Sequence, residues 1–243
     1  MAGVGIAASG MMMMAHPGGA LQSTTHQMQQ QQEWVPLLIT KRIASWKYLG
    51  RVFQGGMVLY NTAMVTEQEM RQFLTEEKIQ RRSMRFFFLG TSLATILEIP
   101  STMDCIKALY HVLHEYEHFA TTESRAKSIF FALKGTADAF DDTGEYSYLE
   151  VRSIPFIPDY VITASSLCGI IAQVYEKLNF QLHQEYLWPM LTIETFQKVD
   201  TRFKRILTTV YKEFEIMARD VMLEELNVVD PLGSSLHDYG WDL

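Results

Sequence analysis

The chain has 243 residues, 48% of them hydrophobic, which is long enough to bury the core of a single domain. Its formal net charge of −7 gives no overall attraction for phosphate backbones, so nucleic acid is not an expected partner unless a local basic patch binds it. Cys105 and Cys168 are the only cysteines, which excludes a disulfide framework, and the first residues lack a secretory or mitochondrial targeting pattern. We therefore expect a cytoplasmic or nuclear protein.

The N-terminal segment, residues 1–33, is of low complexity. It contains a methionine run, a His-Pro-Gly-Gly step and the glutamine tract Gln29 to Gln32, with few β-branched or aromatic side chains. Such a composition offers little apolar surface to offset the entropy lost on ordering. The sequence predicts a disordered tail over 1–33, a folded domain over 34–230 and a flexible C-terminal tail over 231–243.

The first folded segment has two interpretations. Two short β-prone runs lie on either side of Gly55 and Gly56, within the stretch from Trp46 to Asn61. Glycine reaches the positive φ values that tight hairpin turns need, so this pattern predicts a small N-terminal β-hairpin. A helix that passes through Ile43 and Trp46 and ends at Gly50 fits almost as well.

A helix start is marked by Thr66 and Glu69, which are spaced as a capping box. In that motif the hydroxyl and the carboxylate each accept a hydrogen bond from a backbone N–H that the helix leaves unpaired. We expect this helix to run to about Leu89. A further stretch continues towards Ile99 and ends before Pro100, because proline disfavours helical geometry in the residue that precedes it.

The next helix begins near Ser101 and Asp104 and is expected to reach about Phe119. Apolar residues at helical spacing then mark another helical face over 126–140. This face ends at the acidic, glycine-containing turn 141–144. Short connections between these segments favour helices that pack against one another.

An extended segment follows near 145–158, because Pro155 and Pro158 prevent a continuous helix there. Asp159 then caps an apolar helix. Its most apolar part, 161–174, is interrupted by polar residues and is shorter than the roughly 20 residues that span a bilayer. We therefore predict a buried helix that ends before Trp188 and Pro189, and no transmembrane segment.

The last helix carries the clearest signal in the chain. We expect it to begin after Asp200 and to end near Asn227. Its apolar residues recur in steps of three and four and share one face of a helix: Phe203, Leu207, Val210, Phe214, Met217 and Val221. The whole pattern predicts a mainly α, single-domain bundle of about five or six helices.

One motif suggests metal chemistry. His114 and His118 match the pattern H-E-x-x-H, in which two imidazoles on one helix face hold zinc and Glu115 polarises a bound water. A further ligand would come from His111, Glu145 or Glu150. Against this, Glu117 places a charge where such helices usually carry an apolar residue. A solvated helix face would equally explain the ionisable groups of this motif, His114, Glu115, Glu117 and His118.

A second motif combines charge with aromatic residues. Four basic residues precede a phenylalanine run: Lys78, Arg81, Arg82 and Arg85, then Phe86 to Phe88. Such a cluster could contact RNA, anionic lipid or an acidic partner. However, Glu77 stands four residues before Arg81 and compensates part of the charge, and consecutive phenylalanines point in too many directions to form one stacking platform.

No cofactor-binding or nucleophile motif is present, so we expect no cofactor. The favoured function is a non-enzymatic intracellular adaptor or scaffold subunit that binds other proteins. Its candidate contact surfaces are the basic segment, the last helix and the C-terminal tail with Trp241 and Leu243. The alternatives are a zinc-dependent hydrolase that uses His114, His118 and Glu115, and binding of anionic lipid or RNA by the basic segment.

Overall fold

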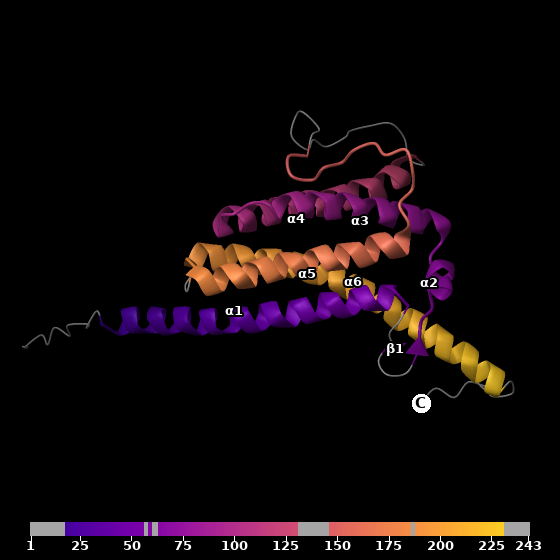
Figure 1. The fold of residues 1–243 in the computed structure, drawn as a ribbon, viewed down its shortest axis with the longest axis horizontal. Coiled ribbons are helices and arrows are strands. Elements are labelled where there is room, and N and C mark those ends of the chain that lie inside the picture. The colour runs from indigo at the N-terminus through magenta and orange to yellow at the C-terminus, as the bar shows by residue number, and fades with distance from the viewer. Residues whose placement is uncertain (1–17, 56–57, 60–62, 131–145, 186–187, 231–243) are drawn as a thin grey trace, which may run out of the picture.

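The fold was analysed in a computed structural model, which describes residues 18–55, 58–59, 63–130, 146–185 and 188–230. Within these ranges the chain forms six α-helices and one pair of very short β-strands. The predicted fold class, a mainly α bundle of five or six helices, is therefore confirmed. Figure 1 shows the helices running roughly parallel or antiparallel to the long axis of the molecule.

The first helix, α1 (Gly18–Phe53), begins earlier than the sequence predicts. The second half of the supposed disordered tail, residues 18–33, is helical, and residues 1–17 lie outside the described part of the chain. Glutamine, leucine, methionine and alanine are good helix formers, so low complexity there does not prevent a helix. The prediction of a domain boundary at residue 34 stays a prediction.

The predicted hairpin around Gly55 and Gly56 does not form. The alternative helix through Ile43 and Trp46 is closer to the structure, although it continues past Gly50 to Phe53. Residues 46–53 continue α1, because Trp46, Leu49 and Phe53 fall on one helix face and are all buried. Strand β1 (Val58–Leu59) instead pairs with β2 (Ala63–Met64), antiparallel and with Val58 opposite Met64. Gly55 ends the helix with a φ of 71°, a conformation that glycine adopts without strain.

The capping box at Thr66 is confirmed. The Thr66 hydroxyl accepts a hydrogen bond from the Glu69 N–H, and the Glu69 carboxylate accepts one from the Thr66 N–H. It starts α2 (Glu67–Phe73), which is short. The chain is extended at Leu74, and α3 (Glu76–Ile96) then begins, so the single helix predicted as far as Leu89 is in fact two.

Helix α4 (Thr102–Phe130) begins where the sequence predicts, with the Asp104 N–H 3.4 Å from the Ser101 hydroxyl. It runs past the predicted end at Phe119. The first part of the helical face predicted over 126–140 belongs to this same helix, and its remainder, with the turn 141–144, lies outside the described residues.

Two long helices complete the fold, α5 (Tyr160–Glu185) and α6 (Met190–Val229). The predicted cap at Asp159 is confirmed, since its carboxylate accepts a hydrogen bond from the Ile162 N–H at 3.0 Å. Residues 146–158 contain no helix or strand, as predicted. In the described part of the chain, no helix combines the length and apolar character needed to cross a membrane.

Helix α6 begins at Met190, so Asp200 is not a helix start but a buried residue within the helix. Its two carboxylate oxygens accept hydrogen bonds from Arg42 Nε at 2.6 Å and Arg42 Nη2 at 2.8 Å. The Tyr175 hydroxyl donates to the same carboxylate at 2.8 Å. The residue after which the sequence predicts the last helix to begin therefore joins α1, α5 and α6.

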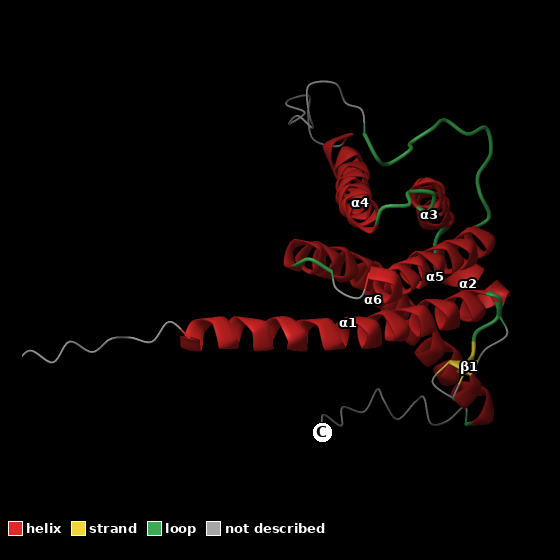
Figure 2. Cartoon of the chain, turned by 60° about the vertical axis from the view of Figure 1, so that its left-hand side comes forward, coloured by secondary structure: helices red, strands yellow, loops and turns green. Residues whose placement is uncertain are grey.

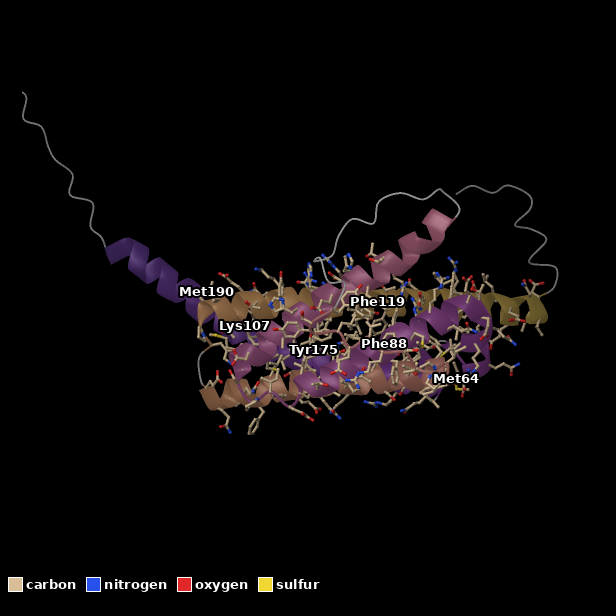
Figure 3. The ribbon with its side chains drawn as sticks, turned by 90° about the horizontal axis from the view of Figure 1, so that it is seen from above. Met64, Phe88, Lys107, Phe119, Tyr175 and Met190 are labelled. Atoms are coloured by element: carbon tan, nitrogen blue, oxygen red, sulfur yellow. The ribbon has the colours of Figure 1, made fainter. Side chains whose placement is uncertain are left out.

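The helices are arranged in layers (Figures 1 and 2). Helices α3 and α4 pack together on one side, α5 and α6 lie beneath them, and α1 runs along the far side against α5. The core between these layers is rich in aromatic side chains. The largest fully buried residues include Trp46, Phe53, Tyr175, Trp188, Phe196, Phe203 and Phe214. Figure 3, seen from above, shows Tyr175 in the middle of the bundle.

Candidate functional site

Glu115 and His118 of the H-E-x-x-H motif lie on the face of α4 that the extended segment covers. Glu115 is buried, and its carboxylate accepts three backbone hydrogen bonds: from the N–H groups of Ser147 at 3.2 Å, Tyr148 at 2.8 Å and Leu149 at 2.7 Å. An ionised carboxylate is a strong acceptor for N–H groups that would otherwise be unpaired. Glu115 therefore anchors the extended segment to α4.

The neighbouring imidazoles contact aromatic residues of the same segment. The His111 ring stacks on Tyr148 with centroids 5.0 Å apart and ring planes 14° from parallel. The His118 Nδ1 atom lies 3.5 Å from the Tyr146 hydroxyl. His114 is exposed on the helix surface. Two of the three histidines thus help to hold the segment in place.

This geometry does not favour zinc hydrolysis. The residues that the structure describes contain no group of three or more His, Cys, Asp or Glu side chains arranged to hold a metal ion. Both oxygens of Glu115, the proposed base, bind backbone N–H groups. Of the proposed further ligands, Glu150 is bonded to Thr95 and Arg152, whereas Glu145 lies outside the described residues.

Beyond Leu149 the extended segment crosses to α3. Leu149 is fully buried, and the Glu150 N–H donates a hydrogen bond to the Ser92 hydroxyl at 2.9 Å. The same hydroxyl donates to the Phe88 carbonyl oxygen within α3. These bonds fix the path of the chain ahead of Phe156, which packs edge-on against Phe87 with centroids 6.4 Å apart. The segment therefore forms one wall of a surface groove.

This groove lies between α3 and α5 and encloses a volume of about 490 Å³. We call it the α3–α5 groove. Its lining is dominated by apolar and small side chains: Phe86, Phe87, Gly90, Thr91, Ala94, Phe156, Pro158, Asp159, Ile162, Thr163, Ser166, Leu167 and Ile170. Phe156 and Ile162 are largely exposed, and an exposed cluster of large apolar side chains in a concave surface is typical of a binding site.

Asp159 is the only charged residue in this lining, and it is paired within the protein by Arg71, which it shares with Glu67. Arg71 Nη2 lies 2.6 Å from one carboxylate oxygen, and the Ile162 N–H donates to the other. Burial alone would raise the pKa of Asp159, but the hydrogen bonds from Ile162 and Arg71 outweigh it and lower the pKa. The groove therefore suits an apolar ligand surface better than a charged one.

The basic segment does not form one continuous surface. Arg82 turns inward and makes a two-pronged ion pair with Glu213 of α6, with Nη2 2.6 Å from Oε1 and Nη1 bonded to Oε2. Burial alone would lower the pKa of Arg82, but the hydrogen bonds to Glu213 raise it above its usual value. Arg82 thus joins α3 to α6 rather than presenting its charge to a partner.

The other basic residues diverge. Lys78 is exposed, and Arg81 Nε donates to the Glu77 carbonyl oxygen at 3.3 Å, with Nη2 3.9 Å from the Glu77 carboxylate. Arg85 lines a separate cavity of about 500 Å³ together with Arg82 and Arg205 of α6. The proposed contacts Trp241 and Leu243 lie outside the described residues. The basic segment therefore offers less charge for lipid or RNA than its sequence suggests.

Sequence reasoning missed the residues that define the groove, Phe156, Ile162 and Ile170. A weak signal was present: Ile162, Ser166 and Ile170 repeat at four-residue spacing, but they lie inside a run that is apolar on most sides and therefore reads as fully buried. No protein-family model, curated protein or solved structure matches this chain. The described part of the chain is a layered helical bundle with an apolar groove between α3 and α5, one wall of which is a segment that Glu115 anchors.

Proposed function

We propose that this protein is a non-enzymatic adaptor or scaffold subunit of the cytoplasm or nucleus, and that its α3–α5 groove binds the apolar face of a helix from a partner protein. The observation that supports this function is the groove itself, with Phe156 and the 68% exposed Ile162 at its surface. Leaving large apolar side chains in water is unfavourable, and association with a partner relieves that cost.

A helix suits this groove for two reasons. The lining combines large apolar side chains with small ones such as Ala94 and Ser166, and small residues allow another backbone to come close. The groove also runs along the boundary between α3 and α5, which pack against each other. The side chains of a third helix can pack into such a groove between two helices. Recognition would then use anchor side chains at helical spacing on the partner.

The test uses two variants with the same charge change on the same helix. Ile162→Asp places a carboxylate in the groove. Phe180→Asp places one at a position of similar exposure, 63%, that does not line the groove. Both positions are exposed, so each change should alter stability by no more than about 0.5 kcal/mol. Thermal unfolding of both purified proteins checks that the fold is intact.

Tagged full-length proteins are then purified from cells that make them, and co-purifying proteins are quantified by mass spectrometry. We expect at least one stoichiometric partner that is retained by Phe180→Asp and lost by Ile162→Asp. A photoreactive amino acid at position 91 of the groove should cross-link to that same partner. If the two variants retain the same set of proteins, or none, the groove is not the docking site.

A further inference from the structure

We propose that the outer end of α6 is a second docking surface, which binds a basic amphipathic helix of a partner protein. We define the C-terminal arm as residues 219–229. Ala218 is the last buried residue of α6, so the arm lies beyond the core. Figure 1 shows this yellow end of the helix continuing past the ends of its neighbours. The surface is separate from the α3–α5 groove and does not depend on the function proposed for it.

The apolar stripe of α6 reaches into the arm. Inside the bundle it is buried at Val210, Phe214 and Met217. Val221 is only half-buried, Glu224 and Glu225 then interrupt the stripe, and Val228, two turns beyond Val221 on the same face, is 78% exposed. The last apolar residues of this face therefore lie where the described part of the chain provides no core to receive them.

A second line of apolar residues lies beside the first. Met222, Leu226 and Val229 follow the spacing i, i+4, i+7 and share one helix face. Met222 is half-buried against the core, while Leu226 is 60% and Val229 is 83% exposed. Exposure thus rises steadily away from the bundle. A partner helix that lies along the arm would cover both lines with its own apolar anchors.

The charge of the arm selects among possible occupants. The arm contains one basic residue, Arg219, and three acidic ones, Asp220, Glu224 and Glu225, and Asp230 follows it directly, so residues 219–230 carry a net charge of −3. Arg219 Nε lies 4.0 Å from the Asp220 carboxylate, so the only positive charge is partly compensated. Negative side chains beside an apolar stripe favour a partner with positive ones at its edges.

Two other occupants are disfavoured by the same charges. A second copy of the chain would bring two acidic arms together, and the whole chain carries a net charge of −7. The chain's own segment 231–243 has apolar residues but adds Asp238 and Asp242 to an already acidic surface. A basic helix from another protein is the occupant whose charge complements both the arm and the rest of the molecule.

The test uses two synthetic peptides of about three heptads with leucine at positions a and d, one with lysine and one with glutamate at positions e and g. Fluorescence anisotropy measures their binding to the full-length protein. We expect the lysine peptide to bind at least about tenfold more tightly than the glutamate peptide, and this preference to shrink between about 0.05 and 0.5 M salt.

Leu226→Asp should weaken binding of the lysine peptide at least about tenfold, since it puts a carboxylate into the apolar line. Two control variants, Leu191→Asp at the opposite end of α6 and Ile162→Asp in the α3–α5 groove, should leave it unchanged. Equal binding of both peptides, or binding that survives Leu226→Asp, would overturn the proposal without affecting the groove.

Two further results would assign the arm to another occupant and would also overturn the proposal. The first is a dimer in sedimentation analysis that Leu226→Asp dissociates, which would show that a second copy covers the arm. The second is tight binding of the lysine peptide only after Leu236, Tyr239 and Trp241 of the full-length chain are replaced by serine. That would show that the chain's own C-terminal segment occupies the surface.

Discussion

Replacing Asp200 by alanine would leave the Arg42 guanidinium buried without its counter-charge. The two side chains are only 10% and 9% exposed, and the pair forms two hydrogen bonds of 2.6 and 2.8 Å. Breaking a buried ion pair by removing one partner costs about 3–5 kcal/mol. The Tyr175 hydroxyl would also lose its acceptor, at a cost of about 1 kcal/mol. We therefore expect Asp200→Ala to lower the free energy of unfolding by roughly 5 kcal/mol.

Guanidinium-induced unfolding followed by circular dichroism measures this loss. A matched control is Glu176→Ala, which removes an ion pair of the same length, 2.6 Å, between side chains that are 52% and 44% exposed. Because water screens that pair, its loss should cost no more than about 1 kcal/mol. The two variants thus compare one ion pair in the core with another at the surface.

A double replacement separates the missing partner from the value of the pair itself. In Arg42→Met with Asp200→Leu neither charge remains, so stability should recover most of the loss and could exceed that of the original protein by about 1–4 kcal/mol. The reasoning is refuted if Asp200→Ala costs no more than Glu176→Ala. It is also refuted if the double variant is as unstable as the single one.

Three further predictions follow from buried polar groups. Glu115→Gln should increase hydrogen exchange at the Ser147 and Leu149 amides and lower stability by about 3 kcal/mol, because the glutamine side chain lacks the charge that strengthens the hydrogen bonds from three N–H groups. Lys107→Ala, at an exposed position of the same helix, should change neither quantity. Burial and Asp200 raise the pKa of Tyr175 in the folded protein well above its usual 10.0. The stability contributed by the neutral hydroxyl is therefore complete below pH 10 and is lost progressively as the pH rises above it. In Tyr175→Phe, the free energy of unfolding should fall less steeply with alkaline pH. Purified protein given zinc and then dialysed should retain much less than one equivalent. Stoichiometric zinc that is lost on His114→Ala would contradict a purely structural role for the H-E-x-x-H motif.

Local signals in the sequence predict the helices well where the signal and its partner are close in the chain. The Thr66 capping box, the Ser101 start and the Asp159 cap all form as expected, because each needs only groups within a few residues. The stripe on α6 likewise predicts the buried residues from Phe203 to Met217, whereas Val221 is only half-buried. These features follow from helical spacing and backbone hydrogen bonding alone.

Other features depend on residues far apart in the chain, and sequence patterns do not show them. The sequence predicts that the last helix begins after Asp200, yet Asp200 lies inside that helix and its partner Arg42 is 158 residues away. Glu115 reads as a catalytic base because of two histidines, yet it binds backbone groups more than thirty residues later. Arg82 reads as a surface charge, yet Glu213 draws it inward.

The candidate groove shows the same limit. Its walls come from α3, the segment that ends at Pro158, and α5, so no single stretch of sequence contains it. Ile162 has the hydrophobic side chain typical of a core residue, and only the path of the neighbouring elements leaves it at the surface. Sequence alone could predict an extended, proline-containing segment, but not which helices it would lie between.

The length of α6 has a geometric consequence. A helix of 40 residues is a stiff rod about 60 Å long, so its far end keeps a fixed separation from the opposite end of the bundle. Each residue inserted would advance that end by about 1.5 Å and turn it by about 100°. Seven inserted residues would move it outward by about 10 Å while nearly preserving its facing, whereas two would point it to the other side. The chain therefore sets both the spacing and the orientation of whatever this end holds.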